Sequence, residues 1–318
     1  AVRRVCSLWH YFSIQKGQSR EMHDNMIDIW TIATGAVVAV TCALLGSFLL
    51  VRKMAMLGDA ISHAVLPGLV IAFLIAGSRD SLAMMLGAAS FGMLTTFLIQ
   101  FFHQKARLAT DASIGVNFTF LFAVGVILVT QYTQQVDLDQ DCVLYGEIAY
   151  VSLDQIALSD GTLIGPRDMW QMLACLAVVV VFIVAFYHRL LLTSFDAGFA
   201  MVSGISIGLW HYGLMGLVSM TTVLAFDSVG AILVVAFLTV PPAAAFLLCR
   251  RMPQVLALSA FFGLLSAAGG YYLSAWLDGS IAGGMAIVAG FILALAVAYV
   301  RGRQLYTNRQ QAQRTVAA

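Results

Sequence analysis

Long apolar stretches, separated by short polar connections, constrain this chain more than any other feature of its sequence. Of its 318 residues, 61% are hydrophobic and only 10% are charged, whereas roughly a quarter of the residues in soluble domains are charged. A helix needs about 20 apolar residues to cross the ~30 Å hydrocarbon core, so the length leaves room for roughly nine crossings and for no separate soluble domain. The sequence therefore predicts an all-α fold, a polytopic transmembrane helical bundle of about eight or nine spans.

Three regions follow from the distribution of polar residues. We expect a polar N-terminal tail over residues 1–28, a transmembrane domain over residues 29–300 and a basic tail over residues 301–318. The expected spans run over residues 29–51, 55–76, 82–103, 110–132, 169–191, 207–225, 229–249, 255–276 and 281–300.

The basic residues predict how the spans are oriented. Nearly all of those outside the N-terminal tail fall in alternate connections: Arg52, Lys53, Lys105, Arg107, Arg189, Arg250, Arg251, Arg301 and Arg303. The opposite connections hold only Arg79 and Arg167. By the positive-inside rule the first set is cytoplasmic, and so is the C-terminus. Nine spans would leave the N-terminal tail outside although its four bases favour the inside, so eight or ten crossings fit the charges as well.

Asp59 and His63 stand four residues apart within the second expected span, in the stretch LGDAISHAVLPG. On a helix they share one face, about 6 Å apart at Cβ. Pro67 has no N–H, so it frees the carbonyl oxygen of His63 on that side. At about 1.5 Å per residue from Lys53, Asp59 lies roughly 9 Å deep and His63 roughly 15 Å deep.

The pair Asp59 and His63 has two possible interpretations. Ionisable side chains at membrane depth cost roughly 2.5 to 3.5 kcal/mol on insertion scales, so they normally face a pore or a partner. The pattern therefore indicates a divalent-cation site on a transport path. The alternative is that Asp59 caps the helix and that His63 donates to a neighbouring carbonyl in the core.

The run GDAISHAVLPG closely resembles the signature of the ABC-3 family, the membrane permeases of bacterial ATP-binding cassette importers for manganese, zinc and iron. Three later stretches resemble that family in order and spacing: ATDASIGVNFT, SFDAGFA and VGAILVVAFLTVPPAAAFLL. The resemblance covers the chain from about residue 30 to about residue 300. It implies a type II-like importer permease architecture, with Asp59 and His63 on the metal path.

The segment over residues 192–205 is too polar to span the membrane. Its residues by themselves indicate an ordinary amphipathic connection between two spans. The resemblance implies instead a coupling helix that docks on a cytoplasmic ATPase, through Ser194, Phe195, Asp196, Phe199 and Ala200.

Two further features concern the path itself. Pro241 and Pro242 remove the helical hydrogen bonds to the carbonyls of Phe237 and Leu238, so we expect this helix, like the one at Pro67, to kink or open beside the pore. The connection over residues 133–168 carries seven acids against one base. It is either a solvated loop or an external vestibule that concentrates cations, with Glu147 as the member nearest the pore.

The chain lacks the means to drive transport or to catalyse a reaction. None of its three lysines follows a glycine, as the lysine of a Walker A loop does, and no cluster of catalytic groups is evident. Its five cysteines are scattered without a C-x-x-C pair, which argues against a thiolate metal site. We therefore expect a non-enzymatic subunit without a permanently bound cofactor.

The leading hypothesis is the permease of an importer for Mn2+, Fe2+ or Zn2+ in the bacterial cytoplasmic membrane. It would pair with a second permease copy or a homologue, bind a cytoplasmic ATP-binding subunit and receive metal from an extracytoplasmic metal-binding protein; nothing suggests a nucleic-acid partner. The alternatives are a secondary proton-coupled metal transporter and an ABC permease for a metal chelate. The sequence alone leaves the choice of metal open, because carboxylate and imidazole suit all three ions.

Overall fold

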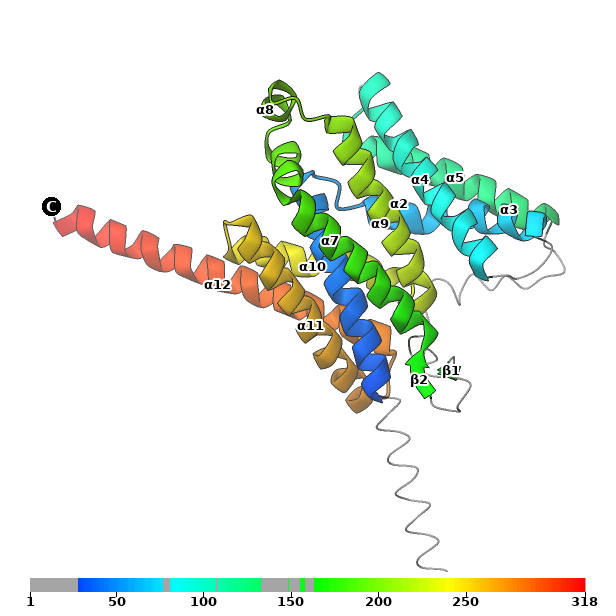
Figure 1. Cartoon of the computed structure of the whole chain (residues 1–318). Helices are drawn as coiled ribbons and strands as arrows, with labels where there is room; N and C mark the ends of the chain where they lie inside the picture. Colours follow the sequence, from blue (N-terminus) through cyan, green and yellow to red (C-terminus); the bar gives the residue numbers. More distant parts are fainter. Residues whose placement is uncertain are drawn as a thin grey trace, which may run out of the picture.

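The computed structural model describes residues 28–76, 81–106, 108–132, 148, 155–157 and 163–317. These residues are almost entirely helical (Figure 1). After a first helix, Asp28–Val51, the helices are α2 (Leu57–Ala64), α3 (Leu66–Ala76), α4 (Ser81–Lys105), α5 (Thr110–Tyr132), α7 (Arg167–Phe195), α8 (Ala197–Val202), α9 (Ile207–Val229), α10 (Ala231–Leu248), α11 (Met252–Leu277) and α12 (Ile281–Ala317). The strands are β1 (Gln155–Ala157) and β2 (Leu163–Pro166).

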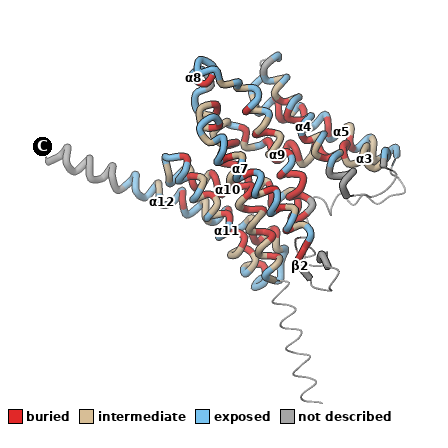
Figure 2. Tube along the Cα trace, viewed as in Figure 1, coloured by how far each residue is buried: buried red, intermediate tan, exposed pale blue. Residues whose placement is uncertain are grey.

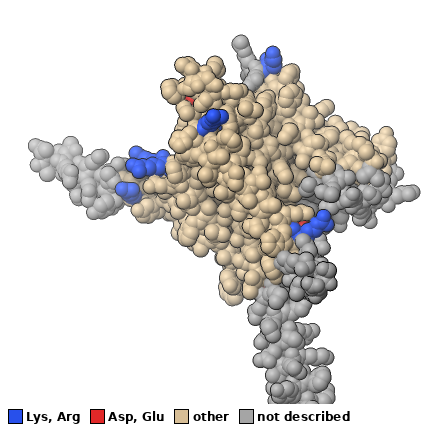
Figure 3. Space-filling view, in the orientation of Figure 1, with Lys and Arg blue, Asp and Glu red and all other residues tan. Residues whose placement is uncertain are grey.

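Nine helical stretches in the described residues are long and apolar enough to cross a membrane, with α2 and α3 counted together as one. This confirms the predicted polytopic helical bundle. On the face drawn in Figure 3, Lys and Arg side chains lie near the ends of helices and leave a broad uncharged area between them. A surface of this kind suits a hydrocarbon environment, where charged side chains are costly.

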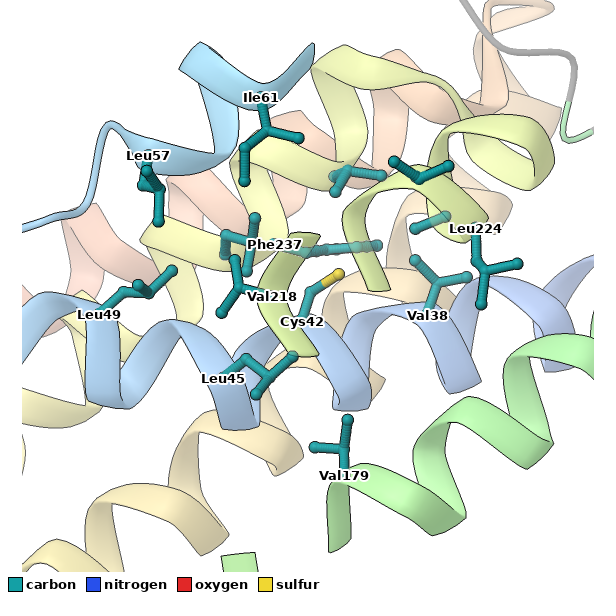
Figure 4. Close-up of a cluster of buried hydrophobic side chains, with 14 of the residues drawn as sticks. Val38, Cys42, Leu45, Leu49, Leu57, Ile61, Val179, Val218, Leu224 and Phe237 are labelled. Atoms are coloured by element: carbon teal, nitrogen blue, oxygen red, sulfur yellow. The ribbon is translucent and has the colours of Figure 1, made fainter. Parts of the chain in front are cut away.

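The core forms where the first helix, α2, α9 and α10 meet. Figure 4 shows Val38, Cys42 and Leu45 of the first helix converging with side chains of α2, α9 and α10. Leu45 and Phe237 are fully buried in this cluster. Buried positions follow the sides of these helices that face one another, while the outer sides are exposed (Figure 2).

The structure adds four details to the sequence prediction. The second span is two helices, because the α-helical pattern is interrupted at Val65, two residues before Pro67. By contrast, α10 continues as one helix through Pro241 and Pro242, so it does not open there. The expected C-terminal tail continues α12 as far as Ala317, and the all-α prediction missed the antiparallel pair of β1 and β2.

The ends of the bundle carry different structures. In Figure 1, α8 lies at one end of the bundle, and β1 and β2 lie at the opposite end. Gly165 of β2 has φ +113, and a Cβ there would lie 2.7 Å from the Trp30 ring, so the strand sits directly on the start of the first helix. The segment predicted to be cytoplasmic and the connection predicted to be external are thus far apart.

Candidate functional site

Helix α2 is amphipathic, and its apolar face is fixed in the core. Leu57 and Ile61, one turn apart, are fully buried. Gly58 packs against α10, since a Cβ at this glycine would lie 2.6 Å from Leu238 Cδ1. With this face held by α10 and α9, the helix cannot rotate freely, and its polar face points away from the core.

Asp59 and His63 lie together on that polar face. His63 Nε2 is 3.7 Å from Asp59 Oδ1, and the two side chains are 33% and 39% exposed, respectively. They are close enough to bind one cation jointly, and open enough for it to enter and leave. Ser62 Oγ donates a hydrogen bond to the backbone carbonyl of Asp59 at 2.6 Å. This hydroxyl therefore does not bond to the Asp59 carboxylate.

Two phenylalanines of α5 form a wall beside this pair that the sequence analysis did not include. The ring centroids of Phe118 and Phe122 lie 5.7 Å and 5.6 Å from that of His63. The two residues are one turn apart within and just after the stretch ATDASIGVNFT, so their helical spacing was the available signal. An apolar wall of this kind restricts the positions that the imidazole can occupy.

Pro67 and Gly125 bring α3 and α5 into close contact below the pair. A Cβ on Gly125 would lie 2.9 Å from Pro67 Cδ. Pro67 therefore has two structural effects. It has no N–H to bond to the backbone carbonyl of His63, and its ring packs against Gly125 of α5, the helix whose phenylalanines contact His63.

The pair supplies only two of the ligands that a transition-metal ion needs. Within the described ranges, no group of three or more His, Cys, Asp or Glu side chains is placed to hold a metal ion. Four to six ligands are usual for Zn2+ or Mn2+, so an ion bound by this pair would need further ligands, such as backbone carbonyls, water or groups of a second chain.

Glu147, the third residue predicted to bind metal, lies outside the described residues, as do Asp137, Asp139, Asp141, Asp154 and Asp160. Its neighbour Ile148 is described and is 2% exposed. A Cβ on Gly35 would lie 3.4 Å from Ile148 Cδ1, so this isoleucine packs on the first helix. Within this connection, Ile148 is therefore a described point of contact with the bundle.

The segment predicted to couple to an ATPase has the structure of a capped helical turn. Asp196 caps α8, and its Oδ1 accepts a hydrogen bond from the backbone N–H of Phe199 at 2.9 Å. Ala200 is buried, whereas Phe195, Phe199, Met201 and Val202 are exposed. Ser194, at the end of α7, is bonded to Arg52 through its Oγ.

Known proteins resemble this chain over most of its length. "Manganese transport system membrane protein MntD" of Bacillus subtilis is 48% identical over 89% of this chain and 95% of its own length. "Zinc transport system membrane protein TroD" of Treponema pallidum is 37% identical over 83% of this chain and 71% of its own. A solved structure, PsaBC from Streptococcus pneumoniae in complex with Fab, superposes with a TM-score of 0.68 at 29% identity, over 84% of this chain and 89% of that one.

The pattern of the ABC 3 transport family, ABC-3, matches residues 22–300, which is most of the chain. This confirms the resemblance drawn from residues 57–68 and from the three later stretches. The chain is therefore a multi-pass membrane protein that belongs to the ABC-3 family.

Proposed function

We propose that this chain is the permease subunit of an ABC importer that moves a divalent transition-metal cation inward across the bacterial cytoplasmic membrane. The observation that carries the proposal is the Asp59–His63 pair, 3.7 Å apart and partly open on the polar face of a membrane-spanning helix. A dehydrated cation needs replacement ligands at this depth, and a carboxylate with an imidazole provides them for Mn2+, Fe2+ or Zn2+.

The cation is the cargo of this site and not a resident cofactor. Two protein ligands hold a metal less firmly than the closed four-ligand shells of structural sites, and a transport site must release what it binds. Relatives named for manganese and for zinc make Mn2+ the first ion to test and Zn2+ the second.

The partners follow from the ends of the bundle. A cytoplasmic ATP-binding subunit would dock on the exposed apolar residues of α8 and hydrolyse ATP for the complex. A second permease, identical or homologous, would contribute to the coordination of the cation, since the described residues of one chain bring only Asp59 and His63 together. An extracytoplasmic metal-binding protein would deliver the ion at the end that carries β1 and β2, and the C-terminus would be cytoplasmic.

A secondary, proton-coupled transporter is the competing function. It would use the same two side chains but would need no docking surface at α8. The exposed Phe195, which ends α7, and the exposed Phe199 on the capped helix α8 favour the ATP-driven transporter, because aromatic anchors that become buried on binding commonly dominate protein interfaces.

The test is uptake of radioactive Mn2+ into proteoliposomes that contain the permease and its ATPase. We expect Asp59→Ala and His63→Ala each to abolish uptake while the ATPase still co-purifies. Ser62→Ala is the matched control, since Ser62 lies on the same helix between the two residues and bonds only to backbone. Uptake at the wild-type rate in either variant would remove the pair from the path.

A further inference from the structure

Arg52, directly after the first helix, joins three parts of the chain that are distant in sequence. Its Nε donates to Ser194 Oγ at 3.0 Å and its Nη2 to Thr193 Oγ1 at 3.2 Å, both at the end of α7. Its Nη1 lies 3.2 Å from His211 Nδ1 in the first turns of α9. Burial lowers the pKa of Arg52 to about 10, so the guanidinium keeps its charge at neutral pH.

The acceptors of Arg52 are neutral and are oriented toward it. Thr193 Oγ1 lies 2.9 Å from the Arg189 carbonyl, where the hydroxyl donates, so a lone pair remains for Arg52. A guanidinium cannot accept a hydrogen bond, so His211 Nδ1 is the acceptor and the imidazole proton resides on Nε2. That Nε2 is buried without a partner. Three hydrogen bonds from the planar guanidinium of Arg52 fix the end of the first helix relative to α7 and α9 more firmly than one flexible contact would.

The turn that follows Arg52 is rigid and leads directly to the metal-binding helix. Lys53 adopts a left-handed conformation with φ 57, and its N–H bonds to the Leu50 carbonyl, while Met54 N–H bonds to the Leu49 carbonyl. This is the Schellman pattern that ends helices, with lysine in the position that glycine usually takes. Met54 is buried and its carbonyl accepts from Leu57 N–H, the first residue of α2.

The other end of the connection is the segment that carries α8. Thr193 and Ser194 are the third- and second-last residues of α7, and Asp196 caps α8 immediately afterwards. A displacement of α8 therefore moves the hydroxyls that hold Arg52. Because the N–H groups of Lys53, Met54 and Leu57 hold the turn after Arg52 by hydrogen bonds, that displacement reaches α2, where Asp59 is the third residue.

We propose that Arg52 is a positioning residue that transmits movement of the α8 segment to α2 and so to Asp59 and His63. The inference rests on the proposed function, because it assumes that α8 moves with ATP hydrolysis and that α2 holds the cargo. Arg52 itself has no contact with the cation in this arrangement. Its substitution should uncouple hydrolysis from transport rather than block either docking or metal binding.

The test measures Mn2+ transported per ATP hydrolysed in proteoliposomes that contain the full permease and its ATPase. In Arg52→Met we expect the ATPase to co-purify and the hydrolysis rate to change little, while the ratio of transported Mn2+ to ATP falls about tenfold, within the usual range of coupling between sites. Arg52→Lys keeps the charge but loses the planar guanidinium, so its ratio of transported Mn2+ to ATP should lie between those of Arg52→Met and wild type. Lys53→Gln removes the neighbouring, exposed charge and should leave the ratio within about twofold of wild type.

A second pair of variants examines the acceptor side without touching Arg52. Thr193→Val keeps the shape of the side chain but removes the hydroxyl, and should lower the ratio, whereas Thr193→Ser should preserve it. If Arg52→Met fails to fold, the comparison of Thr193→Val with Thr193→Ser still tests whether the bond to Arg52 couples hydrolysis to transport.

An unchanged ratio in Arg52→Met, or equal ratios in the two Thr193 variants, would overturn the inference and leave the proposed function intact. Loss of ATPase binding in folded Arg52→Met would also overturn it, because Arg52 would then be a docking residue. A wild-type complex that hydrolysed ATP but transported no Mn2+ would instead overturn the proposed function, and this inference with it.

Discussion

At the scale of single residues, Gly46 explains how α10 tolerates its two prolines. Pro242 has no N–H for the carbonyl of Leu238, so this oxygen lacks its usual helical partner. A Cβ on Gly46 would fall on that same carbonyl oxygen, which means that the Cα hydrogens of Gly46 face it at close range. A weak Cα–H···O contact with the first helix thus replaces part of the lost hydrogen bond.

We therefore expect Gly46→Ala to destabilise the fold, because the added methyl group would meet backbone that cannot rotate away. Overpacking of this kind costs roughly 1–3 kcal/mol or more. The measurement is the unfolding temperature of the detergent-solubilised permease. Gly290→Ala on α12 is the control, since a Cβ at Gly290 has no atom within 4 Å in the described structure. Equal unfolding temperatures for the two variants would show that the first helix can move away from α10.

The residues of the candidate site differ in how far the sequence predicted them. The i, i+4 spacing of Asp59 and His63 was sufficient to place them on one face, because they lie within one short helix, and the structure brings them together. Phe118, Phe122 and Arg52 were not predicted as neighbours of other elements. Their roles depend on which helices pack together, and an apolar pattern in a membrane protein does not encode the partner of each helix face.

At the scale of elements, the helices could be predicted because about 20 apolar residues between polar connections have few alternatives in a membrane. The interruption at Val65 followed from Pro67 by the same reasoning. The continuity of α10 did not, because the contact that accompanies it comes from Gly46, almost 200 residues earlier in the chain. The β1–β2 hairpin was missed because strands of three and four residues leave almost no periodic signal.

Helix α8 provides a prediction at this scale. Phe199 is 58% exposed on a helix that is capped by Asp196 and, with six residues, is too short to span a membrane. If this side chain anchors the ATPase, Phe199→Asp should weaken the complex by about 2 kcal/mol or more, as loss of an interface anchor does. The measurement is co-purification of the ATPase, together with its stimulation by the permease.

Ser203→Asp is the matched control for Phe199→Asp. Ser203 is exposed and ends α8, so the same charge is added at the same end of the molecule without loss of an aromatic side chain. We expect this variant to retain the ATPase. If Phe199→Asp also retained it with full stimulation, α8 would not be the contact.

At the scale of the whole molecule, the two ends of the bundle carry different contacts. Arg52 connects the α8 end to α2 through side-chain hydrogen bonds. At the other end, Ile148 Cδ1 and the Met285 side chain of α12 both lie against Gly35 of the first helix. A transporter that opens to one side at a time needs contacts at both ends of its site, and the described residues supply one set at each end.

The acidic connection over residues 133–168, which the sequence predicts to be external, yields a prediction that distinguishes two roles: raising the local concentration of cations and binding them. Asp137, Asp139 and Asp141 lie outside the described residues, and if they act as an outer rim, their effect on a cation is screened by salt over about 8 Å at 0.15 M and about 30 Å at 0.01 M. Glu147 also lies outside the described residues and directly precedes Ile148, which is buried. If Glu147 is a partly buried ligand of the cation, salt screens its charge little. Neutralising the three aspartates should therefore slow initial uptake of radioactive Mn2+ mainly at low ionic strength, whereas Glu147→Gln should slow it at both ionic strengths. The same salt dependence in both variants would contradict this division of roles, because it would mean that Glu147 lies among the rim charges and that the connection has no ligand near the path.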